Sequence, residues 1–183
     1  MITIVTGGAR SGKSDFAESL YVHTDDVCYI ATSIVADDEM ENRVRLHRES
    51  RNQNWRTYEG YTDLHQALGT EANYLLDCMT ILISNIMYDL SKDEEDLTAD
   101  LIKKIEDKAY LEIANLIYEI REKNKNLVLV TNEVGSAIVP ENKVARSYRD
   151  IVGRVNRRVA EICDRAYLCL LYTSDAADDS PPV

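Results

Sequence analysis

The chain has 183 residues, the size of one domain, and its 32 acidic and 21 basic residues give a formal net charge of −11. This acidity disfavours a nucleic-acid partner, because proteins that bind phosphate backbones carry a basic field. No apolar run approaches the roughly 18 residues of a membrane span and no secretion signal is evident, so we expect a cytoplasmic protein that acts on small molecules.

A phosphate-binding loop is predicted directly after the first strand. Four β-favouring residues, 2–5, lead into a stretch that fits G-x-x-x-x-G-K-[ST], and a helix is expected from about Lys13. An ordinary glycine-rich turn is the alternative, which the flanking strand and helix disfavour. We expect Lys13 to reach the β- and γ-phosphates and Ser14 to hold Mg²⁺. The predicted nucleotide-binding residues of this loop are Gly7, Gly8, Ala9, Arg10, Ser11, Gly12, Lys13 and Ser14.

A second strand is predicted over residues 27–31, and it ends at Ala31, Thr32 and Ser33. Ligands of parallel α/β sheets bind at the carboxyl ends of the strands, so these three residues are candidates for the same nucleotide site. A strand that merely ends here fits the pattern equally well.

A charged helix is expected over residues 37–51, with acids first and bases last. Steps of four place His47 on one face with Arg43 and Arg51, and Arg45 and Arg48 lie nearby. Periodicity alone favours a solvated surface helix with an exposed histidine. The chemical alternative is a nucleophilic histidine, because the surrounding arginines oppose protonation of its imidazole and can hold a triphosphate.

The strand predicted over residues 73–78 contains the carboxylate of Asp77 near its end. In P-loop proteins an Asp at such a position binds Mg²⁺ opposite the hydroxyl of the P-loop, and we expect this role for Asp77. A helix-capping aspartate is the alternative. Upstream, residues 55–59 are expected to be extended and residues 61–69 to form a short helix.

The second half of the chain is predicted to alternate helices with buried strands. Helices are expected over residues 80–90, 97–123 and 145–164, and strands over 127–131 and 166–171. Glu133 follows one strand, where its carboxylate either assists a nucleophile or metal or caps the loop. The D-x-x-G match at Asp150 falls inside a helix and is interpreted as chance.

The pattern therefore indicates one catalytic domain over residues 1–171. Residues 172–183 are polar, without apolar periodicity, and contain Pro-Pro, which predicts a disordered or foreign tail. The four cysteines show no C-x-x-C spacing and are interpreted as reduced thiols.

Several motifs in this order resemble the bifunctional adenosylcobinamide kinase / adenosylcobinamide-phosphate guanylyltransferase family of cobalamin biosynthesis. The P-loop is shared by many families, whereas the histidine-arginine segment and the N-E-V-G segment are narrower signals. The likeness rests on GGARSGKS, Ala31-Thr32-Ser33, Arg43-Val44-x-x-His47-Arg48-x-x-Arg51, Leu76-Asp77-Cys78-Met79-Thr80, Thr131-Asn132-Glu133-Val134-Gly135 and Arg146-x-x-Arg149-Asp150-x-x-Gly153-Arg154-x-Asn156.

This resemblance implies an α/β P-loop NTPase fold, with a RecA-like, mostly parallel sheet flanked by helices, and a homotrimer. It implies two reactions that use GTP and ATP with Mg²⁺: phosphorylation of adenosylcobinamide, then transfer of GMP from GTP to adenosylcobinamide phosphate. By the same resemblance His47 carries the GMP covalently. Beyond the P-loop, the implied nucleotide-binding residues are Ala31, Thr32, Ser33, Arg48, Glu49, Ser50, Arg51, Glu59 and Asp77.

Two other functions remain as alternatives. A simple P-loop kinase of a small metabolite needs Lys13 and Asp77 but leaves His47 idle. A GTP-binding regulatory module usually carries N-K-x-D, and the segment Asn124-Lys125-Asn126-Leu127 lacks the aspartate, so this alternative ranks last.

Overall fold

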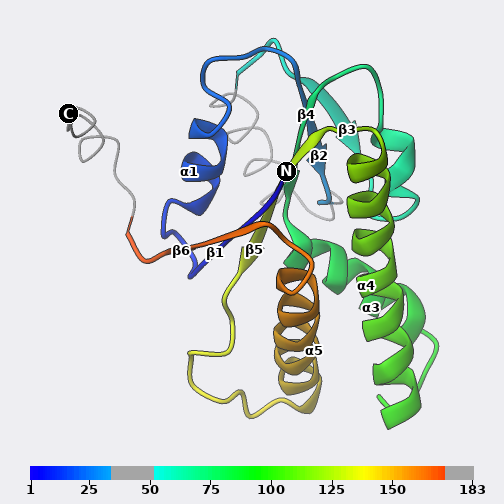
Figure 1. Ribbon diagram of the computed structural model, residues 1–183. Helices are drawn as coiled ribbons and strands as arrows, with labels where there is room; N and C mark the ends of the chain where they lie inside the picture. The colour runs from blue at the N-terminus through cyan, green and yellow to red at the C-terminus, as the bar shows by residue number, and fades with distance from the viewer. Residues whose placement is uncertain (34–51, 172–183) are drawn as a thin grey trace.

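The computed structural model describes residues 1–33 and 52–171 (Figure 1). Within these residues, six parallel strands form one sheet in the order β3-β2-β4-β5-β1-β6. Along the chain the elements are β1 (Ile2–Gly7), α1 (Lys13–Ser19), β2 (Val27–Ala31), β3 (Arg56–Glu59), the 3₁₀ turn η1 (Leu64–Ala67), β4 (Asn73–Asp77), α3 (Met79–Ser91), α4 (Ala99–Glu122), β5 (Asn126–Asn132), α5 (Lys143–Ala160) and β6 (Arg165–Cys169).

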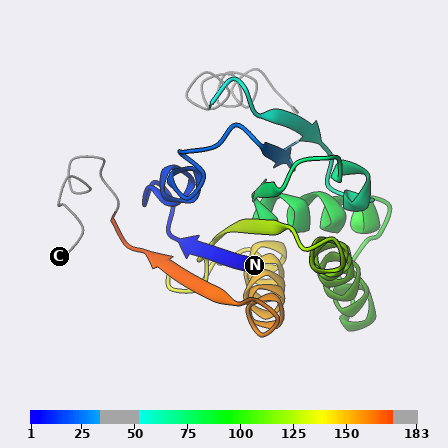
Figure 2. The same ribbon diagram turned by 45° about the horizontal axis from the view of Figure 1, so that its top comes forward.

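The two faces of the sheet are covered by different helices. Alternate side chains of a strand point to opposite faces, so Tyr74 and Leu76 of β4 pack with α3, α4 and α5, while Leu75 packs on the face of α1. Figure 2 shows α1 on one side of the sheet and α4 and α5 on the other. The core therefore consists of two apolar layers, one on each face of the sheet. The helices cover the faces, so the carboxyl ends of the strands are the place where a ligand can bind.

Within residues 1–33 and 52–171 the predicted elements agree with the structure in kind and differ at their ends, whereas the helix expected over residues 37–51 lies outside the described residues. Capping explains two of the differences: Thr98 accepts a hydrogen bond from the Leu101 N–H, so α4 begins at Ala99, and the Asn142 side chain accepts one from the Ala145 N–H, so α5 begins at Lys143. The short helix expected over residues 61–69 is only the turn η1. Asp150 lies inside α5, which rules out a switch loop there.

The last strand also differs, because β6 spans Arg165–Cys169 rather than residues 166–171. The predicted tail at 172–183 lies outside the described residues. Among residues 1–33 and 52–171, no helix combines the length and apolarity that crossing a membrane requires.

An ion pair closes the β3 edge of the sheet. The Arg56 guanidinium bonds the Glu71 carboxylate and donates to the Ala67 carbonyl at 2.5 Å. Hydrogen bonding to Arg56 lowers the pKa of Glu71 from 4.5 to about 2. Because the folded pKa is depressed, the pair stabilises the fold above about pH 4.5, and that stability is lost as the pH falls toward 2.

We therefore expect the unfolding free energy of Glu71→Gln to depend less on pH in the acid range than that of the parent chain. Urea unfolding between pH 6 and 2.5 should give a smaller loss of unfolding free energy for the variant than for the parent chain. The control is Glu95→Gln at an exposed position, for which the parent slope should persist. Equal acid slopes for Glu71→Gln and the parent would contradict the role of this pair.

Candidate active site

The P-loop connects β1 to α1 with a backbone that only a few residue types adopt easily. Gly12 caps α1 with φ 77°, in the left-handed region, and Arg10 also has a positive φ of 58°. The Lys13 Nζ atom donates to the Gly8 carbonyl at 3.2 Å, so the lysine side chain folds back over its own loop. The loop thus holds a cation beside backbone that can receive phosphate oxygens.

The start of the loop lies tightly against the last strand. Gly7 pairs with Cys169 in register, and a Cβ on Gly7 would collide with the Cys169 carbonyl oxygen and lie 2.5 Å from Ser11 Oγ. A glycine is required here by close approach of two backbones, since its φ is not in the left-handed region. The edge strand β6 therefore helps to set the shape of the P-loop.

We expect Gly7→Ala to lower the free energy of unfolding by about 2 kcal/mol, because the added methyl overpacks a site with no room. Gly8→Ala is the matched control, since no atom lies within 4 Å of its added Cβ. Urea unfolding of both variants measures the difference. Equal stability of the two would show that β6 can move away at no cost.

Ser11 supplies a buried polar atom inside the loop. The residue is 6% exposed, and its Oγ finds no hydrogen-bond partner among residues 1–33 and 52–171. Buried hydroxyls are normally bonded, so an unsatisfied one calls for a partner. A phosphate oxygen or an ordered water within the loop fits this requirement.

Four predicted residues lie along the same edge of the sheet. Ala31 at the end of β2 pairs with both Glu59 and Asp77. In the sheet, β5 lies between β4 and β1, and Gly7 is the last residue of β1. Asp77 shares the sheet face of Leu75, which is the face of α1 and its residue Ser14. The sheet therefore brings Glu59, Ala31 and Asp77 to the edge that carries the P-loop.

The oxygen donors at this edge suit a magnesium ion. Ser14 offers a hydroxyl in the first turn of α1, and Asp77 offers a half-buried carboxylate at the tip of β4. Mg²⁺ prefers such oxygens and usually takes its remaining ligands from phosphates and water. In the described parts of the chain, no three His, Cys, Asp or Glu side chains gather as a metal cage. The donor set fits an ion that arrives with a nucleotide.

Thr32 holds the tips of β2 and β4 together. Its Oγ1 donates to the Cys78 carbonyl at 2.8 Å and accepts from the Cys78 N–H at 2.9 Å, and its own carbonyl accepts from the Asn85 amide at 2.9 Å. A direct contact of this hydroxyl with nucleotide would have to compete with both bonds. No role was assigned to Asn85 from the sequence, and its signal was an amide that lies between the buried residues Ile83 and Ile86 of α3.

A second polar cluster ties β5 to α3 and α5, and most of its residues stand in motifs that carried the resemblance, where the sequence assigned them no role. The Asn132 amide donates to Thr80 Oγ1 at 2.7 Å, and the Tyr148 hydroxyl donates to the Thr80 carbonyl at 3.0 Å. From α5, Asn156 bonds Thr131 and the Asn132 carbonyl. These bonds position the tip of β5 between Asp77 and the P-loop.

Glu133 serves the loop after β5. Its carboxylate accepts from the N–H groups of Gly135 and Ser136 at 2.8 and 2.9 Å, which lowers its pKa, and its own N–H donates to the Gly7 carbonyl at 2.9 Å. Of the two roles left open by the sequence, this geometry favours the structural one.

The Lys13 charge acts across the strand tips. Burial, and next the Asp77 charge, raise the pKa of the Cys78 thiol to about 11, while Lys13 opposes this rise. Burial also raises the pKa of Cys169, again against Lys13. Lys13 thus lies within electrostatic reach of both β4 and β6, and both thiols are protonated and unreactive near neutral pH.

The remaining predicted residues are His47, Arg48, Glu49, Ser50 and Arg51, and they lie outside the described residues. Of the others, Gly8, Ala9, Arg10 and Glu59 are exposed, while Gly12, Lys13, Ser14 and Ser33 are half-buried. The described part of the site is therefore a P-loop, with the oxygen donors of Ser14 and Asp77 on the same face of the sheet.

Sequence comparisons show close relatives over nearly the whole chain. The family described as cobinamide kinase / cobinamide phosphate guanyltransferase matches residues 3–171. The chain is 41% identical over 172 residues to the bifunctional adenosylcobalamin biosynthesis protein CobU of Escherichia coli (strain K12), covering 92% of this chain and 94% of that protein. It is 35% identical over 170 residues to the bifunctional adenosylcobalamin biosynthesis protein CobP of Pseudomonas aeruginosa, covering 90% of each.

A solved structure supports the fold. A prototypical ATPase from the type III secretion system of pathogenic bacteria superposes with a TM-score of 0.50 at 11% identity, over 97% of this chain and 52% of that chain. At this identity the likeness concerns the fold alone. The expected P-loop, RecA-like parallel sheet with flanking helices is confirmed.

Proposed function

The chain belongs to the cobinamide kinase / cobinamide phosphate guanyltransferase family, and from this premise we propose the two reactions that it carries out. It is a bifunctional kinase and guanylyltransferase of cobalamin biosynthesis. It first phosphorylates the hydroxyl of adenosylcobinamide with GTP or ATP, and then transfers GMP from GTP to that phosphate, giving adenosylcobinamide-GDP. The observation that carries this proposal is the family match over residues 3–171, which includes the complete P-loop.

In both reactions the P-loop would hold the β- and γ-phosphates. Lys13 exchanges its 3.2 Å bond to the Gly8 carbonyl for phosphate oxygens, and Ser11 Oγ gains the partner that it lacks. Ser14 and Asp77 are the residues that would hold Mg²⁺, which when bound neutralises phosphate charge. Ala31, Ser33 and Glu59 line the same edge and would contact the nucleotide, with Thr32 holding that edge in place.

The second reaction would pass through His47. Its neutral ring nitrogen attacks the α-phosphorus of GTP, the N–P bond forms, and the bond to the bridging oxygen breaks to release pyrophosphate. An oxygen of the acceptor phosphate then attacks the same phosphorus, and the N–P bond breaks. Arg48, Glu49, Ser50 and Arg51 would hold the nucleotide, the arginines offsetting charge on the reacting phosphate.

The test is covalent labelling with Mg²⁺ and GTP carrying radioactive phosphorus at either the α or the γ position. We expect acid-labile, alkali-stable label from α-labelled GTP alone. Trypsin cuts after Arg45 and Arg48, so the label should lie on Leu46-His47-Arg48, whereas His23 and His65 fall in other fragments. Label on another fragment would assign the nucleophile to a residue other than His47. Absence of label on a protein that binds GTP would favour a simple small-metabolite kinase.

The assembly, domain extent and location are part of the same proposal. We propose a homotrimer of chains that each carry one catalytic domain over residues 1–171, with residues 172–183 as an appended tail, acting in the cytoplasm. Analytical ultracentrifugation tests the trimer. A chain truncated after residue 171 that keeps both activities would support the assignment of the tail.

A further inference from the structure

A hollow of about 470 Å³ lies beside α5 and is not used by the chemistry above. It is open to solvent and lies between the outer face of α5 and the loop that follows β5. Its lining residues are Gly135, Arg149, Asp150, Gly153, Arg154 and Arg157. Most of them belong to the R-x-x-R-D-x-x-G-R stretch of α5, to which no role has yet been given.

The hollow adjoins the edge of the sheet that carries the P-loop. The Glu133 N–H donates to the Gly7 carbonyl at 2.9 Å, and the Glu133 carboxylate holds the N–H of Gly135, which lines the hollow. Asn156 of α5 bonds the tip of β5. Helix α5 lies on the sheet face opposite α1 and leads from this edge of the sheet to the start of β6. Asn156 lies at the level of the β5 tip, so the turns of α5 before Asn156 extend beyond the carboxyl ends of the strands.

The lining is positive on a chain that is strongly negative. It carries three arginines and one aspartate, whereas the chain has a net charge of −11. Arg149 pairs with Asp150 at 3.0 Å and Arg154 with Glu106 at 2.6 Å. Arg157 is held less firmly, since Glu161 lies 3.9 Å away and the Arg157 side chain is 76% exposed. A guanidinium thus stands at the hollow with most of its donors facing solvent.

Gly153 leaves a gap between two of these arginines. Steps of four along α5 place Arg149, Gly153 and Arg157 on one face, in successive turns. A glycine inside a helix is less stable than an alanine, and here no atom lies within 4 Å of a Cβ added at Gly153. Packing within the described chain therefore does not call for this glycine. The glycine leaves open space on the helix surface between Arg149 and Arg157.

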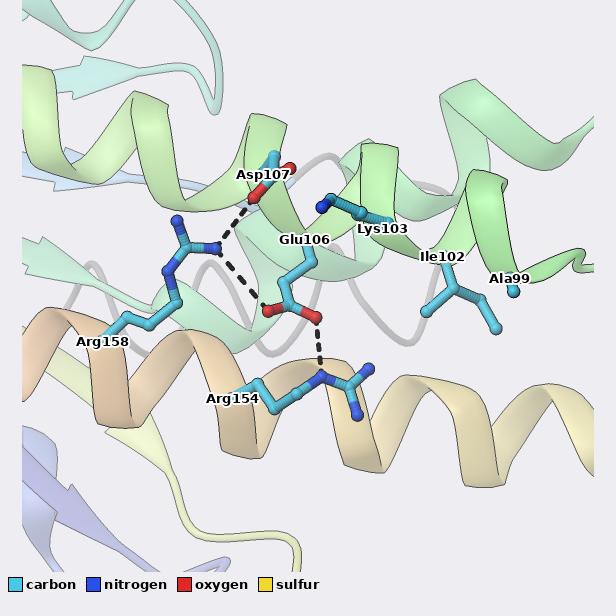
Figure 3. Close-up of a pocket in the computed structure, with 7 residues that line it drawn as sticks. All are labelled: Ala99, Ile102, Lys103, Glu106, Asp107, Arg154 and Arg158. Carbon is cyan, nitrogen blue, oxygen red and sulfur yellow. Dashed lines mark hydrogen bonds and ion pairs between the residues drawn. The ribbon is translucent and has the colours of Figure 1, made fainter.

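The neighbouring hollow between α4 and α5 shows the contrast. Figure 3 shows Arg154 and Arg158 pointing at the carboxylates of Glu106 and Asp107. Arg158 also stacks over the Tyr110 ring, 3.8 Å from its centroid. These charges satisfy one another and join the two helices, so this second hollow is a structural ion-pair network.

We propose that the hollow at Gly153 binds the phosphate of the acceptor, a phosphomonoester of a bulky alcohol, during guanylyl transfer. The inference rests on the proposed function and adds the place of its second substrate. Arg157 and Arg149 bind the dianionic phosphate on either side of Gly153, and the acceptor approaches from the α5 side while the nucleotide occupies the P-loop. Arginine suits this task because its planar donors match phosphate oxygens.

The test measures equilibrium binding of cobinamide phosphate, of unphosphorylated cobinamide and of GTP to the full chain. Gly153→Leu fills the gap and Arg157→Gln removes the exposed cation. Each should weaken binding of cobinamide phosphate by about tenfold or more, with GTP binding unchanged. Arg157→Gln should leave cobinamide binding unchanged, because the alcohol lacks the phosphate. Ala160→Leu and Lys143→Gln on the same helix are the matched controls, since neither residue lines the hollow.

The outcomes separate the two proposals. If the parent chain binds neither corrinoid form, the proposed function fails. If it binds cobinamide phosphate and both variants bind it equally well, the function stands and the assignment of this hollow is overturned. A changed sedimentation coefficient for Gly153→Leu, without change for Ala160→Leu, would also overturn it, because the surface would then be a contact between copies.

Discussion

Lys13→Met is expected to lower kcat/KM of both the kinase and the guanylyl-transfer reaction by roughly 10³-fold, equivalent to about 4 kcal/mol of transition-state stabilisation. One ammonium group would serve both reactions, because the γ-phosphoryl group that it would hold is transferred in the first, and the β- and γ-phosphates leave together as pyrophosphate in the second. The expectation rests on the position of this group: Nζ donates to the Gly8 carbonyl of the P-loop, and its charge reaches the tips of β4 and β6.

Steady-state assays of each reaction with its own acceptor measure this effect. Lys92→Met, at an exposed position after α3, removes the same charge far from the P-loop and should leave both rates within about twofold. Circular dichroism of Lys13→Met should match the parent, since the hydrogen bond from the Lys13 side chain to the Gly8 carbonyl is exposed and lies within its own loop. Loss of one activity with the other intact would mean that the two reactions use different phosphate sites.

His47→Asn is expected to separate the two activities that Lys13→Met removes together. Guanylyl transfer should fall by a factor of roughly 10⁴ or more, because the covalent route is lost with its nucleophile, while the kinase rate stays within about threefold. Asparagine keeps a polar side chain of similar reach but cannot form the phosphoramidate. The covalent label from α-labelled GTP should vanish in the same variant.

His65→Asn is the control, since this histidine lies on the exposed surface of η1. It should keep both rates and the covalent label. Guanylyl transfer that survives in His47→Asn at the parent rate would remove the histidine from the mechanism and favour direct attack of the acceptor phosphate on GTP. Equal loss of both activities would instead assign His47 to nucleotide binding.

The sequence alone predicts those features of this protein that depend on residues close together in the chain. The P-loop and the helix from Lys13 are specified within a dozen residues, by glycines, a lysine and the apolar strand before them. The strand that carries Asp77 is likewise specified by a short apolar run, and it ends at Asp77, one residue before the expected end. Narrow motifs around His47 and Glu133 led to the family, which the comparisons then established.

Tertiary structure decided what depends on residues far apart in the chain. Thr32 meets Cys78, and Thr80 meets Asn132 and Tyr148, only because the sheet places β2, β4 and β5 side by side. Glu133 had two possible roles until its carboxylate was seen to hold its own loop. The gap at Gly153 became a hollow only when the loop after β5 was placed against α5. Periodicity and motifs report on neighbours in sequence, whereas strand order and side-chain partners are set by packing between distant segments.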